Sequence, residues 1–248
     1  METMKQIMYG VTDFARIRAE NGYFVDRTAL IRELEKTSYA MFLRPRRFGK
    51  SLLCSILQCY YDIDYAGRFE EFFGGLDIGR EPTAERGKYL FIDFNFTGVE
   101  KRIDRVQDSF NEYCSERLDV FVERQAGRLP EGTTAAVLAK RTCHEKVNTL
   151  TMRLKGSGLA LYITIDEYDN FTNTILAESR ESYEALCHGD GFFKQFFNEL
   201  KLATTGTDAP VTRLFVTGVT PVTMDDVTSG FNIAANISLN PAFAAFTG

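Results

Sequence analysis

A short apolar segment that runs into glycine, lysine and serine constrains this chain more than any other feature. The apolar segment is 40–43, the three residues are Gly49, Lys50 and Ser51, and the apolar run 52–57 that follows has the character of a helix. A loop of this kind, between a strand and a helix, directs backbone N–H groups and a helix N-terminus toward phosphate groups. The lysine reaches the outer phosphates and the hydroxyl holds magnesium. The segment therefore predicts a phosphate-binding loop.

The loop departs from the usual GxxxxGK[ST] pattern at its first position, where Arg44 replaces glycine. Arginine rarely adopts the positive φ that glycine allows, and a residue before proline, here Pro45, is biased toward extended backbone. We therefore expect Arg44 to be extended and not left-handed. Nucleotide binding is assigned to the rest of the loop and the start of the helix: Arg46, Arg47, Phe48, Gly49, Lys50, Ser51 and Leu52.

A pair of acidic residues, Asp166 and Glu167, follows the continuous apolar run 159–165. The run predicts a buried strand, and open α/β sheets bind ligands at the carboxyl ends of their strands. In a nucleotide site, Asp166 would hold magnesium together with Ser51, and Glu167 would polarise the attacking water. Taken alone, the acids are better explained as caps of the following turn. Combined with the Gly-Lys-Ser motif they favour a nucleotide site, because this chemistry needs both parts.

A hydroxyl ends another apolar strand, 211–217, where Thr217 precedes Gly218. In P-loop ATPases with an additional strand between the two motif strands, a polar side chain at this strand end can orient the lytic water. Thr217 is therefore a catalytic candidate. An ordinary strand terminus followed by a turn explains the same residues equally well.

Three arginines lie within four positions of the loop: Arg44, Arg46 and Arg47. Guanidinium groups beside phosphates can clamp anions or stabilise a transition state, and an arginine finger contributes ~1,000-fold or more to hydrolysis. On this interpretation Arg47 is a catalytic candidate. The arginines could equally pair with carboxylates on neighbouring elements, with Asp26 and Asp93 as candidate partners.

Composition excludes several classes of protein. The chain has 248 residues and a net charge of −5, so its overall charge gives no reason to bind nucleic acid or an anionic membrane. No apolar run approaches the ~20 residues of a membrane span, and the N-terminus is not a signal peptide. We expect a cytoplasmic protein whose partner is a nucleotide, with a protein partner or a homo-oligomer left open. The cysteines lack CxxC spacing and the two histidines form no clear zinc site.

Apolar periodicity predicts strands alternating with helices along the chain. The expected strands are 40–43, 89–94, 159–165 and 211–217, and the expected long helices include 135–154 and 182–202. The alternation predicts an α/β fold with a mostly parallel central sheet. We expect one domain over 1–248, in which 1–38 is a helical N-terminal segment that packs near the nucleotide site. Tyr23, Phe24 and these helices are the candidates for the base pocket.

The order of these motifs resembles the AAA-ATPase-like family of bacterial P-loop ATP-binding proteins. The resemblance rests on Tyr9–Phe14, Tyr23–Thr28, Phe42–Ser51, Phe69–Leu76, Phe94–Phe96, Ile165–Asp169, Thr217–Val219 and Ile237–Leu239. It covers essentially the whole chain, and arginine at the first glycine position is the rule in this family. It implies a P-loop NTPase sandwich of the additional-strand (ASCE) type that binds ATP and Mg²⁺, with Lys50, Ser51, Asp166 and Glu167 in the roles given above.

Full-length relatives in this family usually continue into a C-terminal nuclease-like domain of the PD-(D/E)xK type, which we expect to be missing here. The acid-x-lysine match, Glu199-x-Lys201, lies in an expected helix, whereas the nuclease motif requires a strand. The leading hypothesis is a hydrolase with slow Mg-dependent ATPase activity that regulates a fused or partner effector. The alternative is a nucleotide-gated switch or interaction module with negligible turnover. A third hypothesis is a degenerate scaffold that binds no nucleotide.

Overall fold

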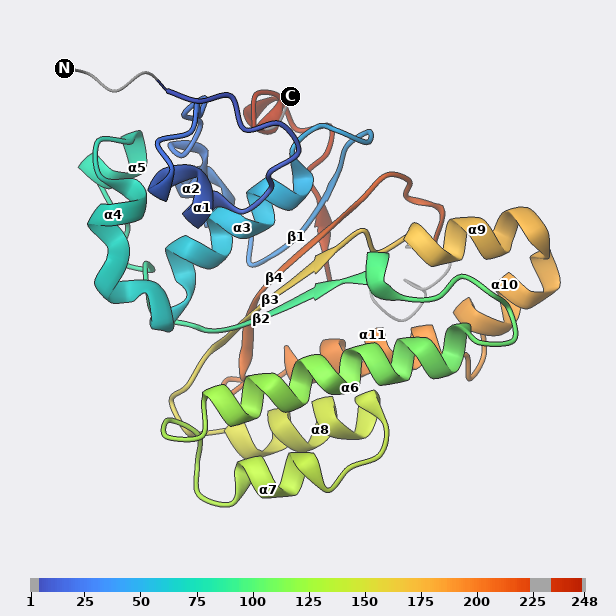
Figure 1. The fold of residues 1–248 in the computed structure, drawn as a ribbon. Helices are drawn as coiled ribbons and strands as arrows, with labels where there is room; N and C mark the ends of the chain where they lie inside the picture. Colours follow the sequence, from blue (N-terminus) through green and yellow to red (C-terminus); the bar gives the residue numbers. More distant parts are fainter. Residues whose placement is uncertain (1–4, 224–232, 247–248) are drawn as a thin grey trace.

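A parallel sheet between two layers of helices forms the centre of the computed structural model, which describes residues 5–223 and 233–246 (Figure 1). Its strands are β1 (Tyr39–Leu43), β2 (Leu90–Asn95), β3 (Leu161–Asp166), β4 (Val211–Gly218) and the short β5 (Ala235–Asn236). Their order across the sheet is β2-β3-β4-β1-β5, and every pair is parallel. The expected α/β fold is confirmed, with a sheet that is wholly parallel in the described part of the chain.

The strand β4 lies between the two strands that carry the sequence motifs. It pairs with β1 from Tyr39 opposite Leu214 to Leu43 opposite Gly218, and it pairs with β3 on its other side. The carboxyl ends of β1, β3 and β4 therefore meet at one edge of the sheet. The phosphate-binding loop and the acidic pair, 115 or more positions apart in sequence, are brought together at that edge by this strand order.

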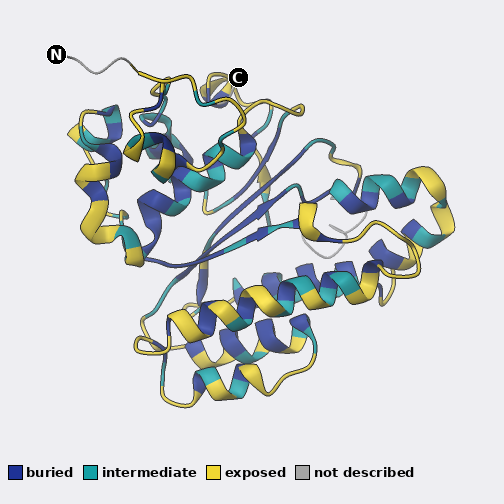
Figure 2. Cartoon of the chain, in the orientation of Figure 1, coloured by how far each residue is buried: buried dark blue, intermediate teal, exposed yellow. Residues whose placement is uncertain are grey.

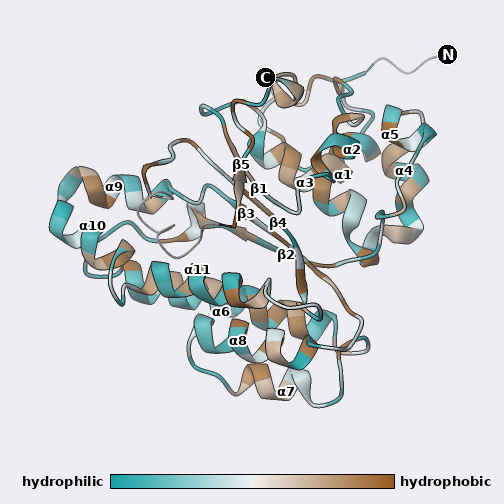
Figure 3. Cartoon of the chain, turned by 180° about the vertical axis from the view of Figure 1, so that it is seen from behind, coloured by the Kyte–Doolittle hydropathy of each residue, from teal (hydrophilic) through white to brown (hydrophobic). Residues whose placement is uncertain are grey.

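The helices divide between the two faces of the sheet (Figure 1). One face carries α1 (Phe14–Ala19), α2 (Leu30–Leu34), α3 (Lys50–Tyr61), α4 (Phe69–Phe73) and α5 (Asp77–Arg80), with the 3-10 helices η1 (Ile63–Arg68) and η3 (Pro241–Phe243). The other carries α6 (Val106–Arg124), α7 (Thr133–Leu138), α8 (Cys143–Leu154), α9 (Asn170–Glu178), α10 (Arg180–Cys187) and α11 (Phe192–Ala203), with η2 (Phe96–Gly98). Each face buries its own apolar cluster against the strands, which Figure 2 shows as dark central ribbons. The hydropathy view in Figure 3 shows hydrophilic positions along α11, which is nearer the viewer from this side.

Two expected long helices are each interrupted. The expected helix 135–154 is α7 followed by α8, because Thr142 and Glu145 form a capping box that starts a new helix. The expected helix 182–202 is α10 followed by α11, and the break falls at Gly191. A Cβ on Gly191 would lie 2.2 Å from the carbonyl oxygen of Leu186, so the chain turns there with a packing that only glycine permits. The helix α9 was not expected.

The N-terminal helix α1 is joined to α3, the helix that follows the Gly-Lys-Ser loop. The Phe14 N–H at the start of α1 donates a hydrogen bond to the Ser55 hydroxyl of α3 at 2.9 Å. All five cysteines are free thiols, and four of them are buried. In the described ranges, no helix combines the length and the apolar character that crossing a membrane requires.

Candidate functional site

The loop between β1 and α3 leaves the sheet at Arg44. Its N–H donates to the carbonyl oxygen of Gly218 at 3.1 Å, which continues the hydrogen bonding between β1 and β4. Among the described non-glycine residues, positive φ occurs at Asn21, Arg47 and Glu167, so Arg44 is not left-handed and that prediction is confirmed. The left-handed positions of the loop are Arg47, with φ 70°, and Gly49, with φ 77°. A left-handed arginine is strained, and strain of this kind gathers at ligand-binding sites.

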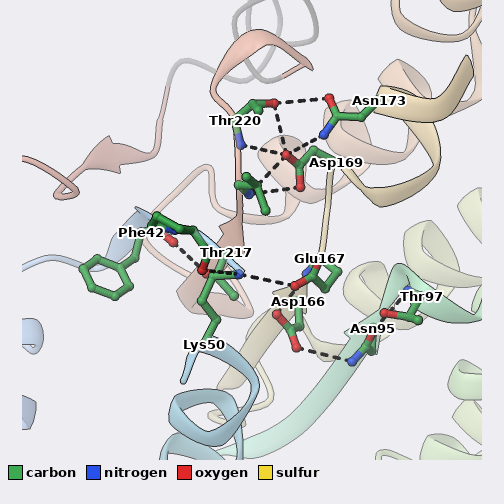
Figure 4. Close-up of polar contacts among 12 residues, drawn as sticks. Phe42, Lys50, Asn95, Thr97, Asp166, Glu167, Asp169, Asn173, Thr217 and Thr220 are labelled. Atoms are coloured by element: carbon green, nitrogen blue, oxygen red, sulfur yellow. Dashed lines mark hydrogen bonds and ion pairs between the residues drawn. The ribbon is translucent and has the colours of Figure 1, made fainter. Parts of the chain in front are cut away.

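Lys50 joins the loop to the acidic pair. Its side chain is buried, and its ammonium nitrogen donates to the Pro45 carbonyl oxygen at 3.2 Å and lies 3.4 Å from Glu167 Oε1 (Figure 4). Glu167 itself has φ 52°, a left-handed conformation immediately after β3. The structure therefore brings together two predicted site residues that stand 117 positions apart (167 − 50) in sequence.

Asp166 and Ser51 line one cavity, which is the second place where the two motifs meet. Asp166 is 3% exposed, and burial raises the pKa of its carboxyl group, although a hydrogen bond from the Ser51 hydroxyl opposes the shift. The Glu167 N–H also donates to Asp166 Oδ1 at 2.9 Å. A buried carboxylate and a hydroxyl thus lie side by side, and both are oxygen ligands that suit Mg²⁺.

Asn95, at the end of β2, completes the surroundings of Asp166. Its amide nitrogen donates to Asp166 Oδ2 at 3.3 Å, while its Oδ1 accepts the Thr97 N–H at 3.0 Å and so fixes which way the amide points (Figure 4). The sequence motifs did not assign Asn95 a role. The sequence feature that could have pointed to Asn95 is its place as a polar residue between Phe94 and Phe96, at the end of an apolar strand.

Asp169 ties the acidic segment to the end of β4. It is 1% exposed, and its carboxylate accepts hydrogen bonds from the backbone N–H groups of Val219, at 3.1 and 3.2 Å, and Thr220, at 2.7 Å. The Asn173 side chain donates to it as well, at 2.9 Å. This approach depends on Gly218, because a Cβ there would lie 2.5 Å from Asp169 Oδ1. Sequence analysis did not assign Asp169 a role.

Thr217 lies in β4 between the loop strand and the acidic strand. Its side chain is fully buried, and its hydroxyl donates to the Phe42 carbonyl oxygen of β1 at 2.6 Å (Figure 4). The Tyr168 N–H donates to the Thr217 carbonyl oxygen at 3.1 Å. Thr217 therefore lies next to the acidic pair, and its hydroxyl is hydrogen-bonded to a neighbouring strand of the sheet.

The loop arginines have different surroundings. Arg44 is partly buried and donates to backbone carbonyl oxygens, whereas Arg46 and Arg47 are exposed. Asp26, one candidate partner, instead accepts hydrogen bonds from Thr28 and from the Asp77 N–H. In the ranges that the structure describes, neither Arg46 nor Arg47 forms an ion pair with Asp26.

Two cavities flank the start of α3. The first, about 300 Å³, is largely apolar and is lined by Ile17, Tyr23, Phe24, Val25, Arg27, Thr28, Ile31, Arg47, Phe48, Gly49, Leu52, Leu53, Ile56 and Phe246. The second, about 220 Å³, is more polar, and its lining includes Ser51, Asp93, Asn95 and Asp166. Asp93, the other candidate partner of the arginines, therefore lies with the acidic cluster. Residues of α3 line both cavities, so this helix lies between an apolar cavity and an acidic one.

The chain is similar to known proteins. A family model described as "Predicted AAA-ATPase" matches residues 8–228, a range that contains all the site residues assigned from the sequence. The chain is also similar to an uncharacterized protein in the vnfD 5′ region of Azotobacter chroococcum mcd 1, with 25% identity over 253 residues. The alignment covers 98% of this chain but 43% of that protein, so the chain spans less than half of its relative's length.

Proposed function

The chain belongs to the AAA-ATPase-like family, and we propose that it binds ATP with Mg²⁺ and hydrolyses it slowly in order to regulate a fused or partner effector. The observation that carries the proposal is the meeting of the two motifs at one place. Lys50 lies 3.4 Å from Glu167, and Ser51 lines the same cavity as Asp166. Phosphoryl transfer from a nucleotide needs a cation, a metal-binding pair and an acid of this kind at one place.

The strand order supports assignment to the additional-strand type of P-loop fold. In that type a strand separates the strand of the phosphate loop from the strand of the acidic pair, and β4 occupies that position here. The order also places the end of β4 beside both motifs. That position is the one expected for a polar residue that senses the terminal phosphate.

The residues beside α3 fit a magnesium ion. In the described ranges, no group of three or more histidine, cysteine, aspartate or glutamate residues is arranged to hold a metal, so an all-protein site is not supported. Mg²⁺ in nucleotide sites instead takes one or two protein oxygens and completes its shell with water and phosphate. Asp166 and Ser51 would hold it, with Asn95 orienting the carboxylate. The ion would neutralise charge on the terminal phosphates and the departing group.

The other roles follow from position. Backbone N–H groups at the loop and at the start of α3 would bind the triphosphate, and Lys50 would neutralise its charge. Glu167 would orient and deprotonate the attacking water once Lys50 has moved toward phosphate. Arg46 and Arg47, which are exposed at the loop, would clamp the phosphates, with Arg47 as the candidate for stabilising the transition state.

The cavity of about 300 Å³ is the proposed base pocket. It adjoins Arg47, Phe48 and Gly49 of the loop, and Tyr23 and Phe24 from the N-terminal segment contribute to its wall. Ligand pockets are typically apolar with a few polar groups, which is the character of this lining. We propose that the base stacks there while the triphosphate follows the loop.

Two variants test the proposal. Lys50→Ala should abolish binding of Mg-ATP in a calorimetric titration, and Glu167→Gln should retain binding while phosphate release stops. Glu178→Gln, an exposed acid at the end of α9, is the matched control and should release phosphate like the unmodified chain. Unchanged ATP affinity in Lys50→Ala would exclude this site.

A nucleotide-gated switch with negligible turnover is the second candidate, and one observation favours it. The Thr217 hydroxyl is engaged with Phe42 and the Glu167 carboxylate is engaged with Lys50, so neither side chain is placed to act on a water. A switch would bind Mg-ATP but release no more phosphate than Glu167→Gln. Phosphate release clearly above that variant would exclude the switch.

A further inference from the structure

Arg44, at the place where the phosphate-loop pattern has its first glycine, contacts a segment almost 200 positions later in the chain. Its Nη1 donates to the carbonyl oxygens of Leu43, at 3.0 Å, and Ser238, at 2.6 Å. Its Nη2 donates to the Phe243 carbonyl oxygen at 3.2 Å. The guanidinium carbon also lies 4.3 Å from the centre of the Phe42 ring. None of these contacts involves a residue that is assigned to the phosphates.

The segment that Arg44 contacts, residues 235–246, reaches the base pocket at its far end. Phe246 is 6% exposed, packs against Phe42 with ring centres 5.8 Å apart, and lines the cavity of about 300 Å³. The segment consists of the two-residue strand β5 and the three-residue η3, so it has little regular structure of its own. A hydrogen bond from the Leu43 N–H to the Ser238 hydroxyl, at 2.8 Å, holds its middle to the end of β1.

We propose that Arg44 is a positioning residue that holds the segment 235–246 in place and so keeps Phe246 in the wall of the base pocket. This rests on the proposed function, because it assigns the cavity to the base of ATP. The forked guanidinium suits the task, since it can donate to several carbonyl oxygens at once while its charge strengthens each bond. Removing it leaves the partly buried carbonyl oxygens of Ser238 and Phe243 without that donor.

The proposal makes Arg44 act on the base and not on the phosphates. The decisive comparison is therefore between two ligands, Mg-ATP and magnesium tripolyphosphate, which share the phosphates and differ in the nucleoside. Arg44→Ala should weaken Mg-ATP by about 10-fold, the order expected for a damaged apolar pocket, and leave tripolyphosphate within about 2-fold. Phe246→Ala should give the same pattern, and the double variant should be little worse than either single variant.

Arg46→Ala is the matched control from the same loop. Arg46 is exposed and is assigned to the phosphates, so its loss should weaken both ligands alike. Equal losses of Mg-ATP and tripolyphosphate in Arg44→Ala would overturn the proposal, because Arg44 would then act on phosphate. Arg44→Lys keeps the charge but not the fork, and should show the same pattern with a smaller loss.

Hydrogen exchange of the full chain tests the anchor without any nucleotide. Arg44→Ala or Arg44→Lys should speed exchange in the segment 235–246 while exchange in α3 stays unchanged. Equal exchange in that segment with and without the Arg44 side chain would overturn the proposal. If the unmodified chain binds tripolyphosphate, and binds Mg-ATP no more tightly than that, the assignment of the cavity to the base is wrong. If it binds neither, the proposed function itself fails.

Discussion

The two ends of the phosphate-binding loop, which are a few residues apart, are built for different tasks. At the entry, Arg44 is not left-handed, and its guanidinium donates to backbone carbonyl oxygens of the segment 235–246. At the exit, Lys50 and Ser51 turn toward Glu167 and Asp166. The replacement of the first glycine therefore leaves the chemical end intact. What the arginine changes is the structure next to the proposed base pocket.

The same contrast exists between Arg44 and Arg47. Arg44 has its polar groups satisfied, whereas Arg47 is exposed and holds a left-handed backbone that costs about 1–2 kcal/mol in a residue other than glycine. Strain that no described contact repays points to a ligand as the partner of Arg47. The following variants test this division, from the largest expected effect to the smallest.

Lys50→Ala tests the exit end and should have the largest effect. Loss of the buried ammonium removes the group that neutralises the phosphates, and it also leaves Glu167 without its partner 3.4 Å away. We expect at least about a 100-fold loss of Mg-ATP affinity by calorimetry, or about 2.7 kcal/mol. Lys36→Ala, an exposed lysine beyond α2, is the control and should bind normally. An affinity loss below a few-fold in Lys50→Ala would contradict the division.

Gly218→Ala tests the connection between the acidic segment and β4. The added Cβ would lie 2.5 Å from both Asp169 Oδ1 and Tyr168 Cδ1, so these buried side chains must move. We expect the free energy of unfolding to fall by about 1–3 kcal/mol in chemical denaturation. Gly127→Ala, where no atom lies within 4 Å of the added Cβ, is the control. Equal free energies of unfolding for Gly218→Ala and Gly127→Ala would show that the side chains around Gly218 can rearrange without cost.

Asn95→Ala tests the residue that orients Asp166. Its amide orients the carboxylate that would hold Mg²⁺. Loss of the partner of a metal ligand commonly lowers metal affinity, so the apparent Mg²⁺ affinity should fall about 10-fold. Titrating MgCl₂ at fixed ATP would measure this, and high Mg²⁺ should restore binding. A loss that excess Mg²⁺ does not restore would place Asn95 outside the metal's surroundings.

Arg47→Gly should have the smallest effect on the fold, and of the opposite sign. Glycine adopts φ 70° without strain, so the free energy of unfolding should rise by about 0.5–1 kcal/mol while affinity for Mg-ATP falls. Arg46→Gly, whose backbone is not left-handed, should not stabilise, and Arg44→Gly should destabilise. A loss of stability in Arg47→Gly would mean that its side chain carries contacts of structural importance.

Local patterns predicted the parts of this site that lie within one segment. The Gly-Lys-Ser loop, the buried strand before Asp166 and Glu167, and an Arg44 that is not left-handed all follow from neighbouring residues. Asn95 and Asp169 could not be assigned in this way, because their roles depend on which strands lie side by side. The partners of Arg44 lie almost 200 positions away, so no pattern around the loop contains them.

Helix boundaries on the second face show the same limit. Apolar spacing continues through both interrupted helices, so periodicity alone predicted single helices over 135–154 and 182–202. The breaks come from a capping box at Thr142 and from close backbone packing at Gly191. The first was readable from the sequence Thr-Cys-His-Glu. The second depends on a contact that exists only in the folded chain.

A crystal structure of the full chain with Mg²⁺ and a non-hydrolysable ATP analogue would show directly where the nucleotide binds. The triphosphate should lie along residues 46–51, with Lys50 moved from Glu167 to phosphate and Mg²⁺ beside Ser51 and Asp166. The base should lie in the cavity lined by Tyr23 and Phe246. Nucleotide bound elsewhere, or bound at the loop with the ion pair between Lys50 and Glu167 unbroken, would contradict the account.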